Sequence, residues 1–261
     1  MNLLEDTLAE LSSMNSYPKQ IFYGGKLELL KRVKVSIVGS RKPTKYSRQM
    51  IQKLSSSLSK VGVCIVSGGA MGIDAVAHNG AGTSNTIAVL PCGVNIRYPA
   101  VNKNLLNGIQ NNGLLLSQFD VDFKATPWSF VVRNELVVAL GDVLVVGEAD
   151  INSGTMRSVE FALKMEKKIY VLPQRLGESE ATNQLIKEGK AEVIYDIDEF
   201  VSKFKTSKIK NDKSLISEDR FIEFCRTNPT YDEVLNKYPD RVFEAELSGE
   251  IEIENGRVIL G

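Results

Sequence analysis

Six short apolar runs in the first two thirds of the chain predict β-strands that are buried on both faces. They are rich in Val, Ile and Leu without polar alternation, which is typical of a parallel sheet covered by helices. Strand-to-helix alternation implies right-handed crossovers, so the pattern predicts an α/β fold with a doubly wound, mainly parallel sheet. The runs are 33–40, 63–69, 86–93, 114–119, 142–149 and 168–174, and helical patterns occupy 45–62, 72–82, 102–113, 133–141 and 155–168.

A different pattern follows residue 202. The Lys-rich stretch 203–214 lacks apolar periodicity and predicts a linker, which we bound at 203–216. Beyond it come three short amphipathic helical patterns and two alternating strands joined by Asn255-Gly256, a strong hairpin signal. We therefore expect a large domain over 1–202 and a small winged-helix-like domain over 217–261.

Composition excludes several classes of protein. The 261 residues are 43% hydrophobic and 25% charged, as in ordinary globular proteins, and no apolar run approaches the ~20 residues of a membrane helix. The acidic N-terminus does not resemble a signal peptide, so we expect a cytoplasmic protein with no membrane contact. Cys64, Cys92 and Cys225 form no CxxC pair and are expected to be buried thiols, and a single histidine excludes two-histidine metal sites. We expect no metal and no cofactor.

A net charge of zero conceals a strong asymmetry. Residues 29–119 hold eleven basic side chains and one acidic side chain, Asp74, a net charge of +10, whereas 120–261 carry −8. Such a basic region is typical of proteins that bind a polyanion. The alternative is a basic face balanced by acidic residues of the same chain or of a second copy.

Three loops at the carboxyl ends of predicted strands are candidates for phosphate binding. Glycine allows close backbone approach, and amides at a helix start bind anions. Neither a G-x-G-x-x-G fingerprint nor a Walker A motif occurs, and tight strand-to-helix turns also need glycine, so each loop alone is a weak signal. Asp74 is expected to cap its helix or to pair with Arg41. The candidate residues in these loops are Gly39, Ser40, Arg41, Lys42, Ser67, Gly68, Gly69, Gly72, Ser153 and Gly154.

Segment 123–134, between the fourth and fifth strands, interleaves basic and aromatic residues. Rings that stack on bases beside cations that meet phosphates are typical of single-stranded nucleic acid sites. For Trp128, packing in the core is the favoured interpretation, and His78 is expected to pack within its helix rather than act as a base. The candidates here are Lys124, Phe130, Arg133 and Asn134.

Taken together, these motifs resemble the DNA-processing protein A (DprA/Smf) family. The resemblance runs over about 17–200 through VSIVGSRKPTKYS, IVSGGAMGIDAVAHNGA, TIAVLPCGVNIRYPAVNKNL and RNELVVALGDVLVVGEADINSGTMRSVEFAL. It implies an extended Rossmann-like, dimeric, non-enzymatic protein that binds single-stranded DNA, protects incoming DNA and helps load the RecA recombinase in natural transformation. Arg41 matches the family's pocket arginine, Phe130 its stacking aromatic, and Ser67 to Gly72 its glycine loop.

Two positions depart from the family pattern. Where the family reads RNR, Arg133-Asn134 is followed by Glu135, and Pro127 and Trp128 precede Phe130 in place of a basic residue. The rival interpretation is a Rossmann-like nucleoside-monophosphate phosphoribohydrolase. Arg157 and Ser158 stand where that family has its two glutamates, which leaves Glu160 as the nearest carboxylate. A nucleotide-sensing regulator without catalysis is a third possibility that the absent fingerprint disfavours.

Overall fold

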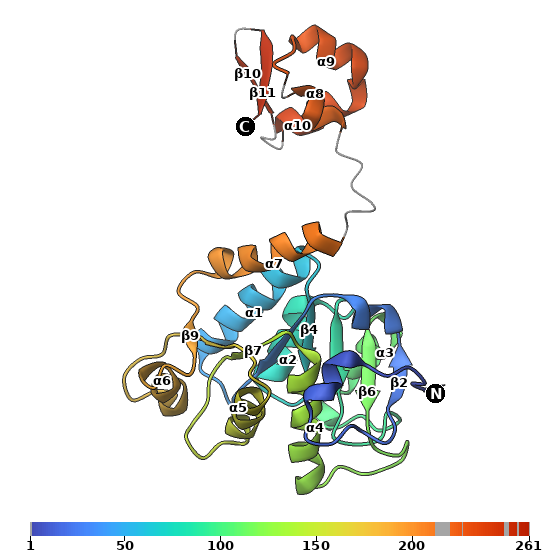
Figure 1. The fold of residues 1–261 in the computed structure, drawn as a ribbon, viewed down its shortest axis with the longest axis vertical. Helices are drawn as coiled ribbons and strands as arrows, with labels where there is room; N and C mark the ends of the chain where they lie inside the picture. The colour runs from blue at the N-terminus through green and yellow to red at the C-terminus, as the bar shows by residue number, and fades with distance from the viewer. Residues whose placement is uncertain (1, 212–219, 226, 248–250, 255, 261) are drawn as a thin grey trace. The chain divides into compact units, whose positions relative to one another are not determined.

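The computed structural model describes residues 2–211, 220–225, 227–247, 251–254 and 256–260. The chain divides into two compact units, Met1–Ser207 and Lys208–Gly261. Each unit has its own buried apolar core. Figure 1 shows the fold of both units.

A nine-stranded sheet forms the first unit, with the order β1-β2-β6-β5-β4-β3-β7-β8-β9. Neighbouring strands from β6 to β9 pair in parallel, while β1 and β2 add an antiparallel edge next to β6. The strands are β1 (Asn2–Leu3), β2 (Phe22–Gly25), β3 (Lys34–Val38), β4 (Cys64–Ser67), β5 (Thr86–Val89), β6 (Leu114–Ser117), β7 (Val143–Val146), β8 (Ile169–Val171) and β9 (Glu192–Val193). The predicted doubly wound, mainly parallel α/β fold is confirmed.

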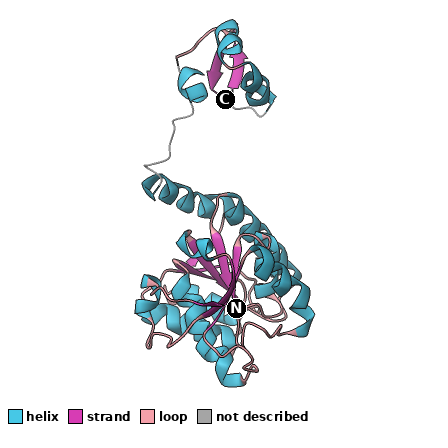
Figure 2. Cartoon of the chain, turned by 90° about the vertical axis from the view of Figure 1, so that its right-hand side faces the viewer, coloured by secondary structure: helices cyan, strands magenta, loops and turns pink. Residues whose placement is uncertain are grey.

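Helices cover both faces of this sheet (Figure 2). Helices α1 (Lys45–Lys60), α2 (Ile73–Ala81) and α7 (Ile197–Asn211) pack on one face, where Ile51, Leu54 and Phe200 join the core. Helix α3 (Lys103–Asn112) buries Leu106 and Ile109 against β5 and β6. The other face is covered by α4 (Pro127–Leu140), α5 (Gly154–Lys164) and α6 (Glu180–Lys187). Burial on both faces explains why the central strands read as continuous apolar runs.

All six predicted strands and five predicted helices occur, but three features differ from the expectations. Helix α4 begins at Pro127 rather than at 133, so most of segment 123–134 is helical. Strands β1, β2 and β9 were not predicted, because β1 and β9 have only two residues each and β2 ends in two glycines without a continuous apolar run. Helix α7 continues to Asn211, so the predicted linker begins inside a helix, and 212–216 lie outside the described residues.

The second unit holds the predicted small helices and hairpin. Helices α8 (Arg220–Cys225), α9 (Tyr231–Lys237) and α10 (Pro239–Leu247) precede the antiparallel strands β10 (Ile251–Glu254) and β11 (Arg257–Leu260). Thr230 caps α9 in a capping box with Glu233, and Phe221, Val234 and Val258 are among the buried residues. This order of elements is the predicted winged-helix-like layout.

The structure also shows the environment of the cysteines and the apolar character of the helices. Cys64, Cys92 and Cys225 are all buried, as predicted. Among the described residues, none of the helices combines the length and the apolar character that crossing a bilayer requires.

Candidate functional site

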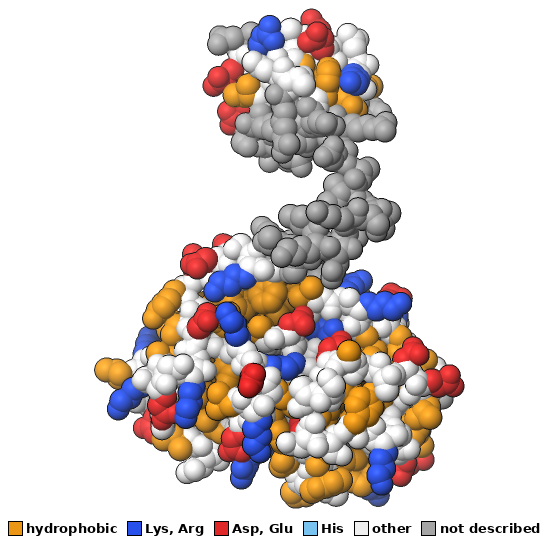
Figure 3. All heavy atoms as spheres, in the orientation of Figure 1, with side chains coloured by type: hydrophobic (Ala, Val, Ile, Leu, Met, Phe, Trp, Pro, Cys, Tyr) orange, Lys and Arg blue, Asp and Glu red, His pale blue; other side chains and the backbone are white. Residues whose placement is uncertain are grey.

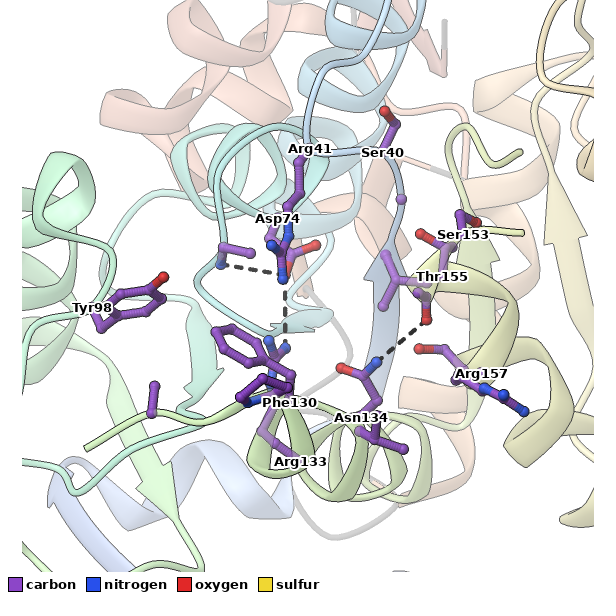
Figure 4. A pocket seen from close by; sticks show the side chains of 18 of the residues that line it. Ser40, Arg41, Asp74, Tyr98, Phe130, Arg133, Asn134, Ser153, Thr155 and Arg157 are labelled. Atoms are coloured by element: carbon purple, nitrogen blue, oxygen red, sulfur yellow. Dashed lines mark hydrogen bonds and ion pairs between the residues drawn. The ribbon is translucent and has the colours of Figure 1, made fainter. Parts of the chain in front are cut away.

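A cavity of about 690 Å³ opens at the carboxyl ends of β3 and β7 (Figure 4). Strand β3 lies between β4 and β7, so chain connections leave it in opposite directions along the sheet. In doubly wound sheets this switch point is the usual place for a ligand, because the loops after the two strands separate there. The Ser40 N–H donates to the Glu148 carbonyl at 2.8 Å, which ties the two loops together at the base of the cavity.

Helix α4 supplies the third wall. Its start is fixed by Thr126, whose side chain accepts the Ser129 N–H at 3.2 Å, and by Pro127 in the first turn. This early start places Phe130, Arg133 and Asn134 three to four residues apart, on the helix side that faces the cavity. Trp128 points elsewhere and is 62% exposed, so the prediction that it packs in the core is wrong.

Phe130 and Arg41 form a stacked pair at the mouth of the cavity. The Arg41 guanidinium carbon lies 5.1 Å from the Phe130 ring centroid, within cation–π distance. Tyr98 meets the same ring edge-to-face at 5.8 Å and is 44% exposed. The arrangement offers an aromatic face and a cation side by side, the pairing expected for a base and its phosphate.

Arg133 lies beneath this pair and is only 3% exposed. Its Nη1 is 3.8 Å from Asp74 Oδ2, so Asp74 pairs with Arg133 and not with Arg41 as one expectation had it. Burial raises the pKa of Asp74, and the guanidinium opposes that shift. Since Arg133 is paired with Asp74 and packs against both Phe130 and Gly68, we assign it a structural role. Arg41 is the guanidinium that is exposed to solvent.

The loop after β7 brings backbone donors into the cavity. Ser153 precedes α5, and the open helix N-terminus begins at Gly154, beside which a side chain would meet no atom within 4 Å. The Asn134 amide donates to the Gly154 carbonyl at 3.5 Å. Ser153 Oγ is buried without a hydrogen-bond partner among the described residues. Such a group at a helix start favours an anionic ligand.

Eight of the fourteen candidate residues line this cavity, and the other six do not. Gly68 borders a small adjoining cavity with Arg41 and Phe130. The Ser67 hydroxyl is buried and donates to the Ile37 carbonyl at 2.6 Å. The backbone at Gly69 and Gly72 has φ of +67° and +80°, so these glycines form the turn. Lys42 and Lys124 are exposed outside the lining. The eight lining candidates are Gly39, Ser40, Arg41, Phe130, Arg133, Asn134, Ser153 and Gly154.

Besides Asp74, sequence reasoning did not include six polar or aromatic residues of the lining among the candidates: Tyr98, Thr126, Asp150, Thr155, Arg157 and Ser158. In Figure 4 the Tyr98 ring lies on the Phe130 side of the cavity, whereas the Arg157 side chain points away from the cavity and pairs with Glu160. Asp150 stands in the loop after β7 and its position was a usable signal, whereas nothing local marks Tyr98. Glu135, which replaces the second arginine of the family pattern, is outside the lining and accepts the Asn15 N–H at 2.7 Å.

Two side chains that could act as an acid or a base in a hydrolase, Glu160 and His78, are not placed for that role. Glu160, the carboxylate on which the rival interpretation depends, pairs with Arg157 at 2.9 Å and does not line the cavity. His78 is buried, and its pKa is lowered to about 3 by burial and by Arg133. In the part of the chain that the structure describes, no group of three or more metal-ligating side chains occurs.

Fold and cavity together define a Rossmann-like α/β protein with a ligand site at its switch point. The family model for DNA recombination-mediator protein A matches residues 6–205. The chain belongs to this family, which confirms the resemblance drawn from the sequence.

Individual relatives agree with this assignment. The chain is 34% identical to the DNA processing protein DprA of Streptococcus pneumoniae over 69% of its own length and 65% of that protein, and 32% identical to Protein Smf of Escherichia coli over 69% and 50%. A structure of DNA processing protein A from Helicobacter pylori, described by its single-stranded DNA binding mode, superposes with a TM-score of 0.77 at 39% identity, over 79% of this chain and 96% of that one. The chain thus spans about half to two thirds of these two curated relatives.

Proposed function

We propose that the chain binds single-stranded DNA in the switch-point cavity and acts as a DNA-processing protein in natural transformation. One observation carries the proposal: the solvent-open Arg41 guanidinium stands 5.1 Å from the Phe130 ring centroid at the mouth of a cavity of about 690 Å³. Related proteins named for DNA processing, one of them described as binding single-stranded DNA, support it.

In this proposal each group of residues has a separate role. A base stacks near Phe130 and Tyr98, while Arg41 pairs with the adjoining phosphate through charge-assisted hydrogen bonds. A second phosphate meets the N-terminus of α5 and the Ser153 hydroxyl. Arg133 acts through Phe130 and stays paired with Asp74. Whether Lys42, Lys124 and the loop from Ser67 to Gly72 touch DNA stays a prediction.

We further propose that the protein is not an enzyme, works in the cytoplasm as a homodimer, protects incoming DNA and helps load RecA. The family resemblance supports the recombinase role. The same resemblance implies a homodimer and supports that part of the proposal. The position of Glu160 outside the cavity supports the non-enzymatic assignment, because the hydrolase interpretation depends on that carboxylate.

Binding of a labelled single-stranded oligonucleotide across a range of salt concentrations tests the proposal. Arg41→Ala should weaken binding by about 1–3 kcal/mol and make the log–log salt slope shallower by about 0.7, because one phosphate contact is lost. Phe130→Leu keeps apolar volume but loses the ring, so binding should weaken by a similar amount, about 1–3 kcal/mol, with the slope unchanged.

Arg175→Ala is the matched control, because Arg175 is an exposed arginine outside the cavity lining. Its affinity should stay near that of the unmodified chain. Unchanged binding by correctly folded Arg41→Ala and Phe130→Leu proteins would refute the assignment of DNA to this cavity. Release of a free base from a nucleoside monophosphate, abolished by Glu160→Gln, would favour the hydrolase instead.

A further inference from the structure

A second hollow lies on the outer face of α1, away from the switch-point cavity. It has a volume of about 630 Å³, and seven of its eight lining residues come from α1. They form two rows with a spacing of four residues, 48, 52, 56, 60 and 49, 53, 57, so they occupy one continuous helix face about 18 Å long. This basic groove is lined by Arg48, Gln49, Gln52, Lys53, Ser56, Ser57, Lys60 and, from α2, Val76.

The lining is rich in hydrogen-bond donors and contains no carboxylate. Arg48, Lys53 and Lys60 are exposed, and none of them forms an ion pair within 4 Å in the described part of the chain. Amide and hydroxyl side chains fill the space between the three cations. Three cations without an ion pair in one shallow groove attract a polyanion, since releasing its counterions favours binding.

One carboxylate lies near the edge of the groove. The N–H groups of Glu199 and Asp198 hold the pKa of Asp196 below its ordinary value, and the positive charge of Lys53 adds a smaller effect in the same direction. Asp196 Oδ1 is already engaged, because it accepts the N–H groups of Asp198 and Glu199 at 2.7 and 3.0 Å and so caps α7. Asp196 therefore reduces the attraction of Lys53 for an anion. No carboxylate interacts with Arg48 or Lys60 among the interactions that the structure shows.

Helix α1 starts beside the switch-point cavity. Ser40 and Arg41 line the cavity, Thr44 caps α1, and the basic groove lies on the following turns of that helix, from Arg48 to Lys60. Lys42 and Lys45, both exposed, stand between the two hollows. A chain that leaves the cavity beside Arg41 therefore meets cations at successive turns of α1.

We propose that the basic groove on α1 binds the phosphodiester backbone of the same single DNA strand whose bases enter the switch-point cavity. This inference rests on the function proposed above and extends the site. The groove offers no aromatic ring to stack on, so it binds phosphates without regard to sequence. Its contribution appears only with strands long enough to reach past Lys45.

Two oligonucleotide lengths test this inference with the full chain. Arg48→Gln, Lys53→Gln and Lys60→Gln are combined in one variant, and salt-dependent binding is measured with strands of about six and about twenty nucleotides. For the long strand, the salt slope should become shallower by about two units, because three contacts at about 0.7 each are lost. We expect affinity for the long strand to fall at least tenfold, while the short strand binds as before.

A matched control separates the groove from overall charge. Lys19, Lys26 and Lys31 are exposed lysines of the segment around β2, outside the groove. Changing these three to Gln removes the same charge and should leave both strands bound nearly as before. Equal losses in the two variants, or a groove variant that binds the long strand normally, would overturn the inference. Failure of the unmodified protein to bind the short strand would instead refute the function proposed for the cavity.

Discussion

The guanidinium of Arg133 occupies the space in which a side chain on Gly68 would begin. A Cβ built on Gly68 would overlap Arg133 Nη1 and would lie 2.7 Å from Asp74 Oδ2. The backbone at Gly68 does not have a positive φ, so the space alone, not the conformation, requires glycine there. The glycine loop after β4 thus serves the buried ion pair beneath Phe130.

Gly68→Ala should therefore reduce the free energy of unfolding much more than the addition of one methyl group usually does. The added Cβ must displace Arg133 from Asp74, and breaking a buried ion pair costs about 3–5 kcal/mol. We expect the free energy of unfolding, measured by chemical denaturation at neutral pH, to fall by about 3 kcal/mol. Gly154→Ala is the control, because a Cβ there meets nothing within 4 Å, and it should change stability by less than about 0.5 kcal/mol.

A double-mutant cycle identifies the cause of that loss. Once Arg133→Ala has removed the guanidinium, adding Gly68→Ala should cost clearly less than it does in the unmodified protein, because only the 2.7 Å contact with Asp74 Oδ2 remains. Additive losses from the two changes would show that Gly68 is needed for some other reason.

The buried His78 makes stability depend on pH. Thr86 Oγ1 donates its one proton to the Ile65 carbonyl at 2.7 Å, so the His78 Nδ1 at 2.7 Å from that oxygen must be the donor. Nε2 is then unprotonated, and it is buried without a partner among the described residues. Burial and the positive charge of Arg133 lower the pKa of His78 to about 3.

Acid should destabilise the fold through this residue. The unfolded chain binds a proton at His78 below about pH 6.5, whereas the folded chain does not until about pH 3, so stability is full above 6.5 and falls on acidification. Between pH 7.5 and 5.5 the unfolding free energy should drop about 1.4 kcal/mol more in the unmodified protein than in His78→Asn. Equal slopes in the two proteins would contradict a neutral buried His78.

The C-terminal unit is not expected to read DNA despite its winged-helix-like layout. Residues 217–261 carry eleven acidic and five basic side chains, a net charge of −6. Basic side chains here are engaged within the unit: Lys237 Nζ lies 3.9 Å from the Phe224 ring centroid, and Arg257 donates to the Asn228 carbonyl at 2.7 Å. An acidic surface repels a polyanion, and a protein partner suits it better.

Removing residues 212–261 tests this expectation. Binding of a short single strand by the remaining chain should stay unchanged or tighten slightly, because the deleted unit carries net negative charge. Circular dichroism and sedimentation provide the control that the remaining chain is folded and keeps its oligomeric state. A tenfold or greater loss of affinity in a folded protein would show that the small unit contributes to DNA binding after all.

Local patterns in the sequence were enough to predict the architecture of the sheet. The runs from Val33 to Gln174 are apolar because both faces of each strand are covered, and the glycine-rich turns follow them directly, so the sheet and its ligand edge could be predicted. The residues of the GSRKPT and NSGT loops and of segment 123–134 could also be assigned to one site. The two-residue strand β9 and the half-exposed strand β2, which ends in two glycines, carry no such signal.

Only the tertiary structure decided what each site residue does. Arg41 and Arg133 look alike in the sequence, yet one is open to solvent over Phe130 and the other is buried against Asp74. Tyr98 reaches Phe130 across 32 residues of chain, and Gly68 is small because of a side chain 65 residues away. Burial, pairing and steric exclusion are set by neighbours distant in the chain. The sequence by itself therefore determined the fold and the ligand edge, and packing alone decided which arginine is free to bind and which holds the site together.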